Sequence, residues 1–127
     1  MANSPRVYIL DDRPENLEVM AVVFQAAGAT TFTTSDPLQL IQGVLHPDGD
    51  PIDLVILDIH MPHRDGFSVA QELREKGFSR GIVAFTAHPT LQGKRKGEGV
   101  GIDHFLSKPS LKVDLVRALL HEVCACK

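Results

Sequence analysis

Side chains that could take part in chemistry stand at the ends of short apolar runs in this sequence. These runs are rich in Val, Ile and Leu, a composition typical of strands that are buried on both faces of a parallel sheet. Five polar residues end or follow the runs: Asp11, Asp12, Asp58, Thr86 and Lys108. The carboxyl ends of parallel strands meet at one edge of a sheet, where ligands bind. We therefore expect three carboxylates, a hydroxyl and an ammonium group to lie close together.

The types of these residues indicate chemistry on a phosphoryl group. Clustered carboxylates repel one another unless a cation joins them, and oxygen ligands of this kind suit Mg²⁺. An Asp carboxylate can attack phosphorus and form an aspartyl-phosphate, whose oxygens Thr86 and Lys108 could stabilise. We do not expect ATP as the direct donor, because the sequence shows no Gly-rich nucleotide loop. For Asp58 alone, the alternative is a helix N-cap, a position that Asp favours.

The strands and helices that must position these residues alternate along the chain. Apolar runs predict strands at residues 6–10, 29–34, 52–57, 81–85 and 102–106. Helical spacing, together with Pro at first turns and Gly behind last turns, predicts helices at 14–27, 37–45, 66–76 and, after a cap at Ser110, 111–123. This alternation predicts an α/β fold with a parallel sheet and right-handed crossovers.

The segment between Thr86 and Ile102 is a poor helix by composition. Four of the nine residues 93–101 are Gly, each costing about 1 kcal/mol relative to Ala in a helix interior. Leu91 and Val100 are almost its only apolar residues. We therefore expect a short, frayed or displaced fourth helix, in which the basic residues 94–96 form a solvated face.

Apolar spacing also predicts which helix faces meet the core. The second helix carries the apolar residues Leu38, Ile41, Val44 and Leu45. The last helix has two apolar stripes, the first made of Leu111, Leu115, Ala118 and Leu119, and the second of Val113, Val116, Leu120 and Val123. The first stripe is enough for a core, so the second is either a dimer or partner surface or the mark of a more deeply buried helix.

The overall composition is that of one globular domain spanning residues 1–127. Apolar residues make up 43% and charged residues 23%, and the formal net charge of -3 argues against a nucleic-acid surface. No apolar run approaches the roughly 18 residues of a membrane span, and residues 1–6 carry no apolar signal region, so a cytoplasmic location is expected. Cys124 and Cys126 are too close in sequence for an ordinary disulfide and are expected to be free thiols.

Several short motifs, taken together in this order and spacing, resemble one known family over essentially the whole chain. They are Asp11 to Asn16, Leu57 to Pro62, Asp65-Gly66, Thr86-Ala87 and Phe105 to Pro109. The sequence resembles the receiver domain of bacterial two-component response regulators. The resemblance implies a flavodoxin-like, doubly wound sheet of five parallel strands in the order 2-1-3-4-5, with helices on both faces.

The resemblance also implies a role for each site residue in a phosphorylation-dependent signalling switch, rather than in a turnover enzyme. Asp58 would accept a phosphoryl group from a histidine kinase or a phosphotransfer protein. Mg²⁺ would be held by Asp12 directly, by Asp11 partly through water, and by Asp58 and the backbone carbonyl of His60. Lys108 would pair with the phosphoryl group, next to a cis Lys108–Pro109 peptide bond. Thr86 and Phe105 would form the switch pair.

Two histidines, His60 and His88, lie two residues after Asp58 and Thr86. In the resembled family, side chains at the positions of His60 and His88 flank the phosphoryl group and influence its access to water. We expect these two imidazoles to set the lifetime of the phosphorylated state; the alternative is that both are exposed loop residues without such a role.

Other interpretations of the chain follow from the same residues. Asp58 could be the nucleophile of a phosphatase similar to the haloacid dehalogenase family, although that family has a second Asp two residues on, where this chain has His60. A phosphate-independent interaction domain on the same fold is a third reading. The chain could be a stand-alone receiver or one domain of a larger regulator or hybrid kinase, acting through a homodimer or a downstream output protein.

Overall fold

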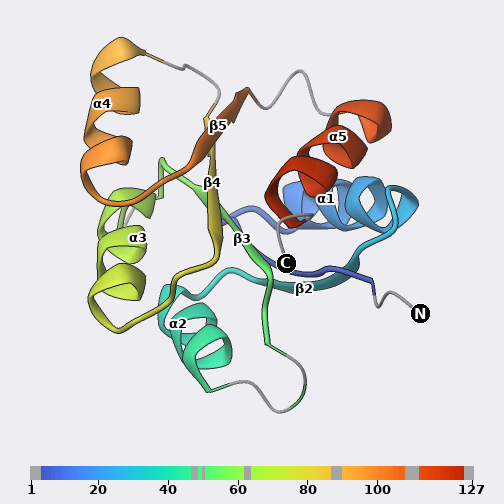
Figure 1. Ribbon diagram of the computed structural model, residues 1–127, viewed down its shortest axis with the longest axis horizontal. Coiled ribbons are helices and arrows are strands. Elements are labelled where there is room, and N and C mark those ends of the chain that lie inside the picture. The colour runs from blue at the N-terminus through green and yellow to red at the C-terminus, as the bar shows by residue number, and fades with distance from the viewer. Residues whose placement is uncertain are drawn as a thin grey trace.

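A computed structural model describes residues 4–46, 49, 51–61, 64–86, 90–107 and 112–124. Its centre is one sheet of five parallel strands in the order β2-β1-β3-β4-β5 (Figure 1). The strands are β1 (Arg6–Leu10), β2 (Thr30–Thr34), β3 (Leu54–Asp58), β4 (Gly81–Thr86) and β5 (His104–Ser107). The predicted fold class and strand order are therefore confirmed.

Five helices cover the two faces of this sheet. They are α1 (Pro14–Ala26), α2 (Pro37–Leu45), α3 (Gly66–Glu75), α4 (Leu91–Gly99) and α5 (Val113–Cys124). Helices α1 and α5 lie side by side on one face, and α2, α3 and α4 lie on the other (Figure 1). Alternate residues of β3 serve the two cores, with Leu54 and Ile56 facing α1 and α5, and Val55 and Leu57 facing α2 and α3. In the described part of the chain, no helix is long and apolar enough to cross a membrane.

The register of the strands brings their carboxyl ends to one level. Leu10 is paired with Thr34 on one side and with Leu57 on the other, and Asp58 is paired with Phe85. Asp58 is itself the last residue of β3 rather than the first residue after it. It is not a helix cap, because the N-cap of α3 is Asp65.

Helix α4 is short, as the sequence predicted, and it is also continuous over its nine residues. The hydroxyl of Thr90 caps its first turn by accepting a hydrogen bond from the amide of Gly93 at 3.0 Å. The ammonium of Lys96 lies 4.7 Å from the centre of the Phe67 ring. Gly97 is buried against the ring of Phe105, where a Cβ would overlap the ring. Gly97 lowers the intrinsic stability of the helix, but it also allows α4 to pack closely on the ring of Phe105.

The buried faces of two helices depend on their packing, and the predicted core stripe of the last helix was partly wrong. In α2, Leu38 is 57% exposed, whereas Leu40 is buried beside Ile41 and Val44. In α5, two of the three described residues of the first stripe, Leu115 and Ala118, are exposed. The core residues of α5 are Val116, Leu119 and Leu120, a set that combines the two stripes because α5 packs against both the sheet and α1. Leu111 lies outside the described residues.

Candidate functional site

Three carboxylates converge at the carboxyl edge of the sheet. Asp11 follows β1 and is fully buried, Asp58 ends β3 and is 2% exposed, and Asp12 is partly buried. Each offers an oxygen, and these three oxygens lie within 4.8 Å of one another. The predicted cluster of acids is therefore present in the described part of the chain.

Backbone amides orient two of these carboxylates. Asp11 Oδ1 accepts a hydrogen bond from the amide of Arg13 at 3.0 Å, and its Oδ2 accepts a longer one from the Asn16 side chain at 3.4 Å. Asp58 Oδ1 accepts from the amide of His60 at 3.1 Å. These hydrogen bonds therefore fix the direction in which the two carboxylates point.

The donor set of this cluster fits a hard divalent cation. Three carboxylates, two of them buried, carry a concentration of negative charge that a cation would offset, and Mg²⁺ commonly binds one or two carboxylates together with phosphate oxygens. The residues that could hold such an ion are Asp11, Asp12 and Asp58.

Comparison with known proteins identifies the architecture that carries this cluster. Residues 7–120 match the response regulator receiver domain family. The chain belongs to this family. Receiver domains are signalling domains of two-component systems, and phosphorylation on Asp is general to them.

Relatives of this receiver domain occur in proteins of different kinds. It is 31% identical over 117 residues to the two-component response regulator ARR22 of Arabidopsis thaliana, covering 91% of this chain and 81% of that protein. It is 30% identical to hybrid signal transduction histidine kinase L of Dictyostelium discoideum over 87% of this chain but only 7% of the kinase. It is 29% identical to the sensor histidine kinase GacS of Pseudomonas protegens over 94% of this chain and 13% of the kinase.

Solved structures share the fold. The chemotaxis protein CheY4 of Vibrio cholerae superposes with a TM-score of 0.84 at 22% identity, covering 94% of this chain and 98% of that one. A two-component response regulator from Clostridium difficile gives a TM-score of 0.84 at 19% identity, with coverages of 97% and 98%.

The residues predicted as the switch pair of this receiver domain lie on neighbouring strands. Thr86, the last residue of β4, is 4% exposed, and Phe105 lies on β5, paired in register with Ala84. Both line a mainly apolar hollow of about 260 Å³, whose walls also include Phe67 and Lys94. Space therefore adjoins both members of the pair.

The remaining predicted site residues are placed only in part. His60 is exposed and lines the same hollow, while its amide holds Asp58. Lys108, the Lys108–Pro109 peptide bond and His88 lie outside the described residues. Their predicted roles stay predictions.

Sequence reasoning missed the part that Gly66 plays in the site. Its amide donates a hydrogen bond to the carbonyl of Ile59 at 3.2 Å. A Cβ at Gly66 would stand 2.7 Å from the backbone oxygen of Asp58. The start of α3 therefore touches the backbone of the acid, and only Gly fits there. The Asp65-Gly66 pair was the available signal, since Asp caps helices and Gly permits close approach.

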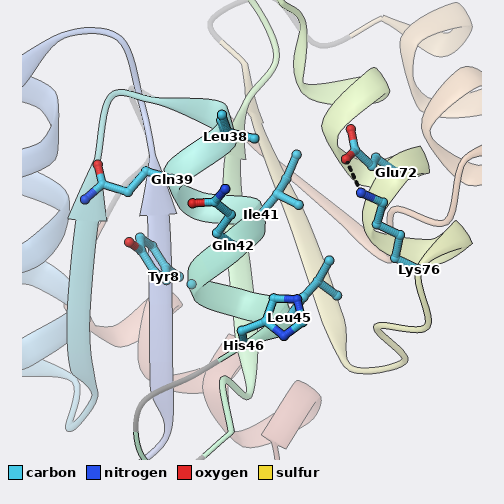
Figure 2. A pocket seen from close by; sticks show the side chains of 10 residues that line it. Tyr8, Leu38, Gln39, Ile41, Gln42, Leu45, His46, Glu72 and Lys76 are labelled. Atoms are coloured by element: carbon cyan, nitrogen blue, oxygen red, sulfur yellow. Dashed lines mark ion pairs between the residues drawn. The ribbon is translucent and has the colours of Figure 1, made fainter.

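A second and larger hollow of about 670 Å³ lies between α2 and α3 (Figure 2). Tyr8 is one of its lining residues and its ring lies close to Gly43, and burial raises the pKa of the Tyr8 phenol. Leu38 stands at its rim, and the Glu72–Lys76 ion pair borders it. It shares no lining residue with the acid cluster, and is thus a separate feature of the surface.

Proposed function

We propose that Asp58 is the residue of this receiver domain that accepts the phosphoryl group. The supporting observation is the position of Asp58, which is buried at the end of the central strand with oxygens of Asp11 and Asp12 within 4.8 Å of its own. The donor would be a histidine kinase or a histidine phosphotransfer protein, the partners with which receiver domains interact.

The transfer requires a nucleophile and a means of stabilising charge. The Asp58 carboxylate attacks phosphorus while the bond from phosphorus to the donor histidine nitrogen breaks. The donor ring, protonated on its other nitrogen, takes the electron pair of that bond and leaves as neutral imidazole, and Asp58 becomes an aspartyl-phosphate. Bound Mg²⁺ would supply positive charge for the phosphoryl oxygens. The amide of His60 orients the attacking carboxylate, and the Thr86 hydroxyl and Lys108 ammonium would donate hydrogen bonds to the transferred group.

The signal would be transmitted by Thr86 and Phe105. Thr86 would turn toward the new phosphoryl group, and the ring of Phe105 would move into the space beside it. The hollow that both residues line supports this proposal, as does the contact between Phe105 and Gly97, which would connect the ring to α4.

Three further features belong to the same proposal. His60 and His88 would shield the aspartyl-phosphate from water, and the exposed side chain of His60 on the wall of the hollow is consistent with this. The domain would not turn over a substrate: its own chemistry would be limited to slow self-phosphorylation from small donors and slow loss of the phosphoryl group. It would act in the cytoplasm, with a downstream output protein or a second copy as partner.

Mass spectrometry of the intact protein tests the proposal. With a small phosphodonor and Mg²⁺, the wild type should gain one phosphoryl group, and either Asp58→Asn or chelation of the metal should abolish the gain. Normal labelling of Asp58→Asn would show that another residue is the acceptor. Steady release of phosphate from a generic phosphoester would support a phosphatase instead.

A further inference from the structure

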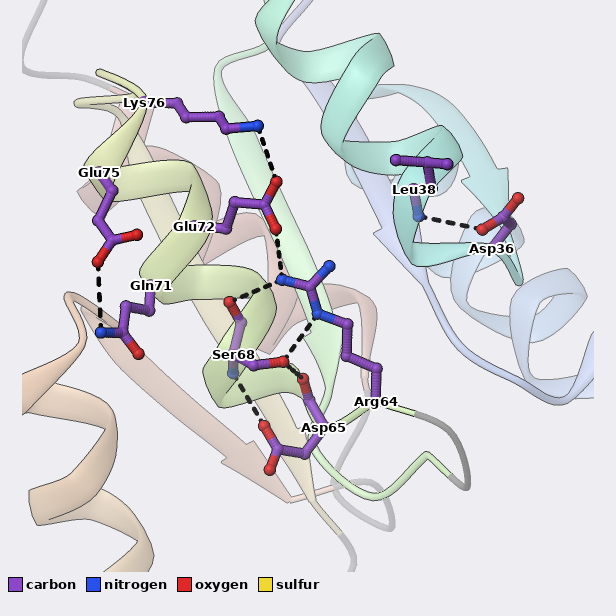
Figure 3. Close-up of polar contacts among 9 residues, drawn as sticks. All are labelled: Asp36, Leu38, Arg64, Asp65, Ser68, Gln71, Glu72, Glu75 and Lys76. Atoms are coloured by element: carbon purple, nitrogen blue, oxygen red, sulfur yellow. Dashed lines mark hydrogen bonds and ion pairs between the residues drawn. The ribbon is translucent and has the colours of Figure 1, made fainter.

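Arg64 makes a set of contacts that the acceptor chemistry does not use. It lies between the end of β3 and the start of α3, and its side chain extends along the helix from Ser68 toward Glu72 (Figure 3). Its Nε donates to Ser68 Oγ at 2.9 Å, and its Nη2 donates to the Ser68 carbonyl at 3.1 Å and to Glu72 Oε1 at 2.6 Å. One guanidinium therefore grips two successive turns of α3.

The second carboxylate oxygen of Glu72 is paired with Lys76. Lys76 Nζ lies 2.9 Å from Glu72 Oε2, while Arg64 takes Oε1. The hydrogen bonds from Arg64 and then from Lys76 lower the pKa of the Glu72 carboxyl, so it is charged at neutral pH. The side chains of Arg64 and Glu72 are 31% and 26% exposed, which makes the pair better shielded than an ordinary surface ion pair.

The helix does not need Arg64 in order to begin. Asp65 Oδ1 already accepts from the amide of Ser68 at 2.8 Å, and Ser68 Oγ donates to the Asp65 carbonyl at 3.0 Å. Arg64 directly precedes this cap, and its side chain fixes its own position in the chain relative to α3. The guanidinium thus attaches residue 64, which precedes the helix, to the body of α3.

The start of α3 is in direct contact with the backbone of the acceptor. Two residues after Arg64, the amide of Gly66 is bonded to the Ile59 carbonyl, and Gly66 packs on the carbonyl of Asp58. The amide of His60, the residue after Ile59, donates a hydrogen bond to the Asp58 carboxylate. A shift of the segment 64–66 would therefore be felt at residues 58–60.

From this chain of contacts we propose that Arg64 is a positioning residue for phosphoryl transfer, which holds residues 64–66 in place at the start of α3 through Ser68 and Glu72. The inference rests on the proposed role of Asp58. The planar guanidinium suits the task because it presents several donors in one rigid arrangement, which a Lys ammonium does not. Groups that hydrogen-bond metal ligands directly commonly change metal affinity 10- to 100-fold when they are removed. Arg64 acts less directly, through residues 66 and 58–60, so we expect an effect at the lower end of that range.

Magnesium titration of the unphosphorylated protein, followed by the amide NMR signals of Asp12, Asp58 and His60, is the direct test. Arg64→Ala should raise the dissociation constant for Mg²⁺ about tenfold. Arg64→Lys and Glu72→Gln should raise it less. Labelling of Arg64→Ala by a small phosphodonor should be slow at low Mg²⁺ and recover most of the wild-type rate when Mg²⁺ is saturating.

Arg80→Ala is the matched control, because Arg80 also forms one Arg–carboxylate pair, with Asp53 at 2.8 Å, at the opposite end of β3. It should leave the Mg²⁺ affinity unchanged. The proposal is overturned if Arg64→Ala weakens Mg²⁺ binding no more than Arg80→Ala does. If Arg64→Ala does not fold, unchanged affinities in both Arg64→Lys and Glu72→Gln overturn it equally. A wild type whose Asp12 and Asp58 signals ignore Mg²⁺ would instead count against the proposed function.

Discussion

The ring of Phe105 on β5 lies directly beneath Gly97 of α4, at a distance that leaves no room for a side chain on residue 97. Gly97 is the one buried residue of α4, all of whose residues the structure describes. The helix therefore packs on an aromatic ring that also lines the hollow beside Thr86. Any reorientation of this ring would change the surface on which α4 rests.

Gly97→Ala should reverse the usual effect of this substitution. In an open helix, Ala in place of Gly stabilises by about 1 kcal/mol. At Gly97 the new methyl overlaps Phe105, and overpacking of this kind costs about 1–3 kcal/mol. Urea unfolding should show a lower midpoint, and the NMR signals of the Phe105 ring should shift.

Gly99→Ala in the same helix is the control, since a Cβ there would meet no atom within 4 Å. It should be neutral or stabilising. Equal effects of the two substitutions would mean that the close contact between Gly97 and Phe105 is absent in solution.

Gly66→Ala should damage the acceptor site more than the fold. The methyl would press on the Asp58 backbone oxygen and displace either α3 or the end of β3. Because small misplacements of reacting groups are costly, we expect labelling by a small phosphodonor to slow about tenfold or more. Gly28→Ala provides the comparison: its φ of 104° disfavours Ala, but a Cβ there meets nothing within 4 Å. That variant should lose stability and keep its labelling rate.

The charge of Glu72 should make a pH-dependent contribution to stability. Because folding lowers the pKa of this carboxyl, its contribution is present above the pKa of the unfolded chain and is lost as the pH falls through the lower pKa of the folded state. Thermal unfolding of the wild type and Glu72→Gln should differ at pH 7, with the variant less stable, and the difference should shrink on acidification. A constant gap between the two curves at every pH would contradict this.

Helix α4 should exchange its amide hydrogens faster than α3. Only Gly97 is buried in α4, whereas α3 buries Gly66, Phe67, Val69, Ala70 and Leu73. With little apolar anchoring, local opening of α4 should be easy even though the helix is continuous. Hydrogen exchange read by NMR or mass spectrometry checks this. Equal protection of residues 93–99 and 66–75 would show that the Gly97–Phe105 and Lys96–Phe67 contacts are enough to stabilise α4.

The position of the acid cluster was predictable from the order of residues alone. Short apolar runs that end in Asp or Thr, separated by helical patterns, imply parallel strands, and parallel strands align their carboxyl ends. Asp11, Asp12, Asp58 and Thr86 could therefore be assigned to one edge before any contact was known. Local signals also predicted the starts of α1 and α2, where Pro14 and Pro37 occupy the first helical positions.

Tertiary contacts decided the features that depend on partners far away in the chain. The glycine content of α4 argues against a stable helix. The closeness of Phe105 makes Gly97 favourable there, because a larger residue would overlap the ring. The core face of α5 depends on where α1 and the sheet lie, which the spacing of its apolar residues does not determine. The grip of Arg64 on Ser68 and Glu72 depends on the direction in which a long, flexible side chain turns after the loop. Periodicity along the chain thus specifies elements and their ends, whereas the packing of one element on another selects among the faces and side-chain positions that periodicity allows.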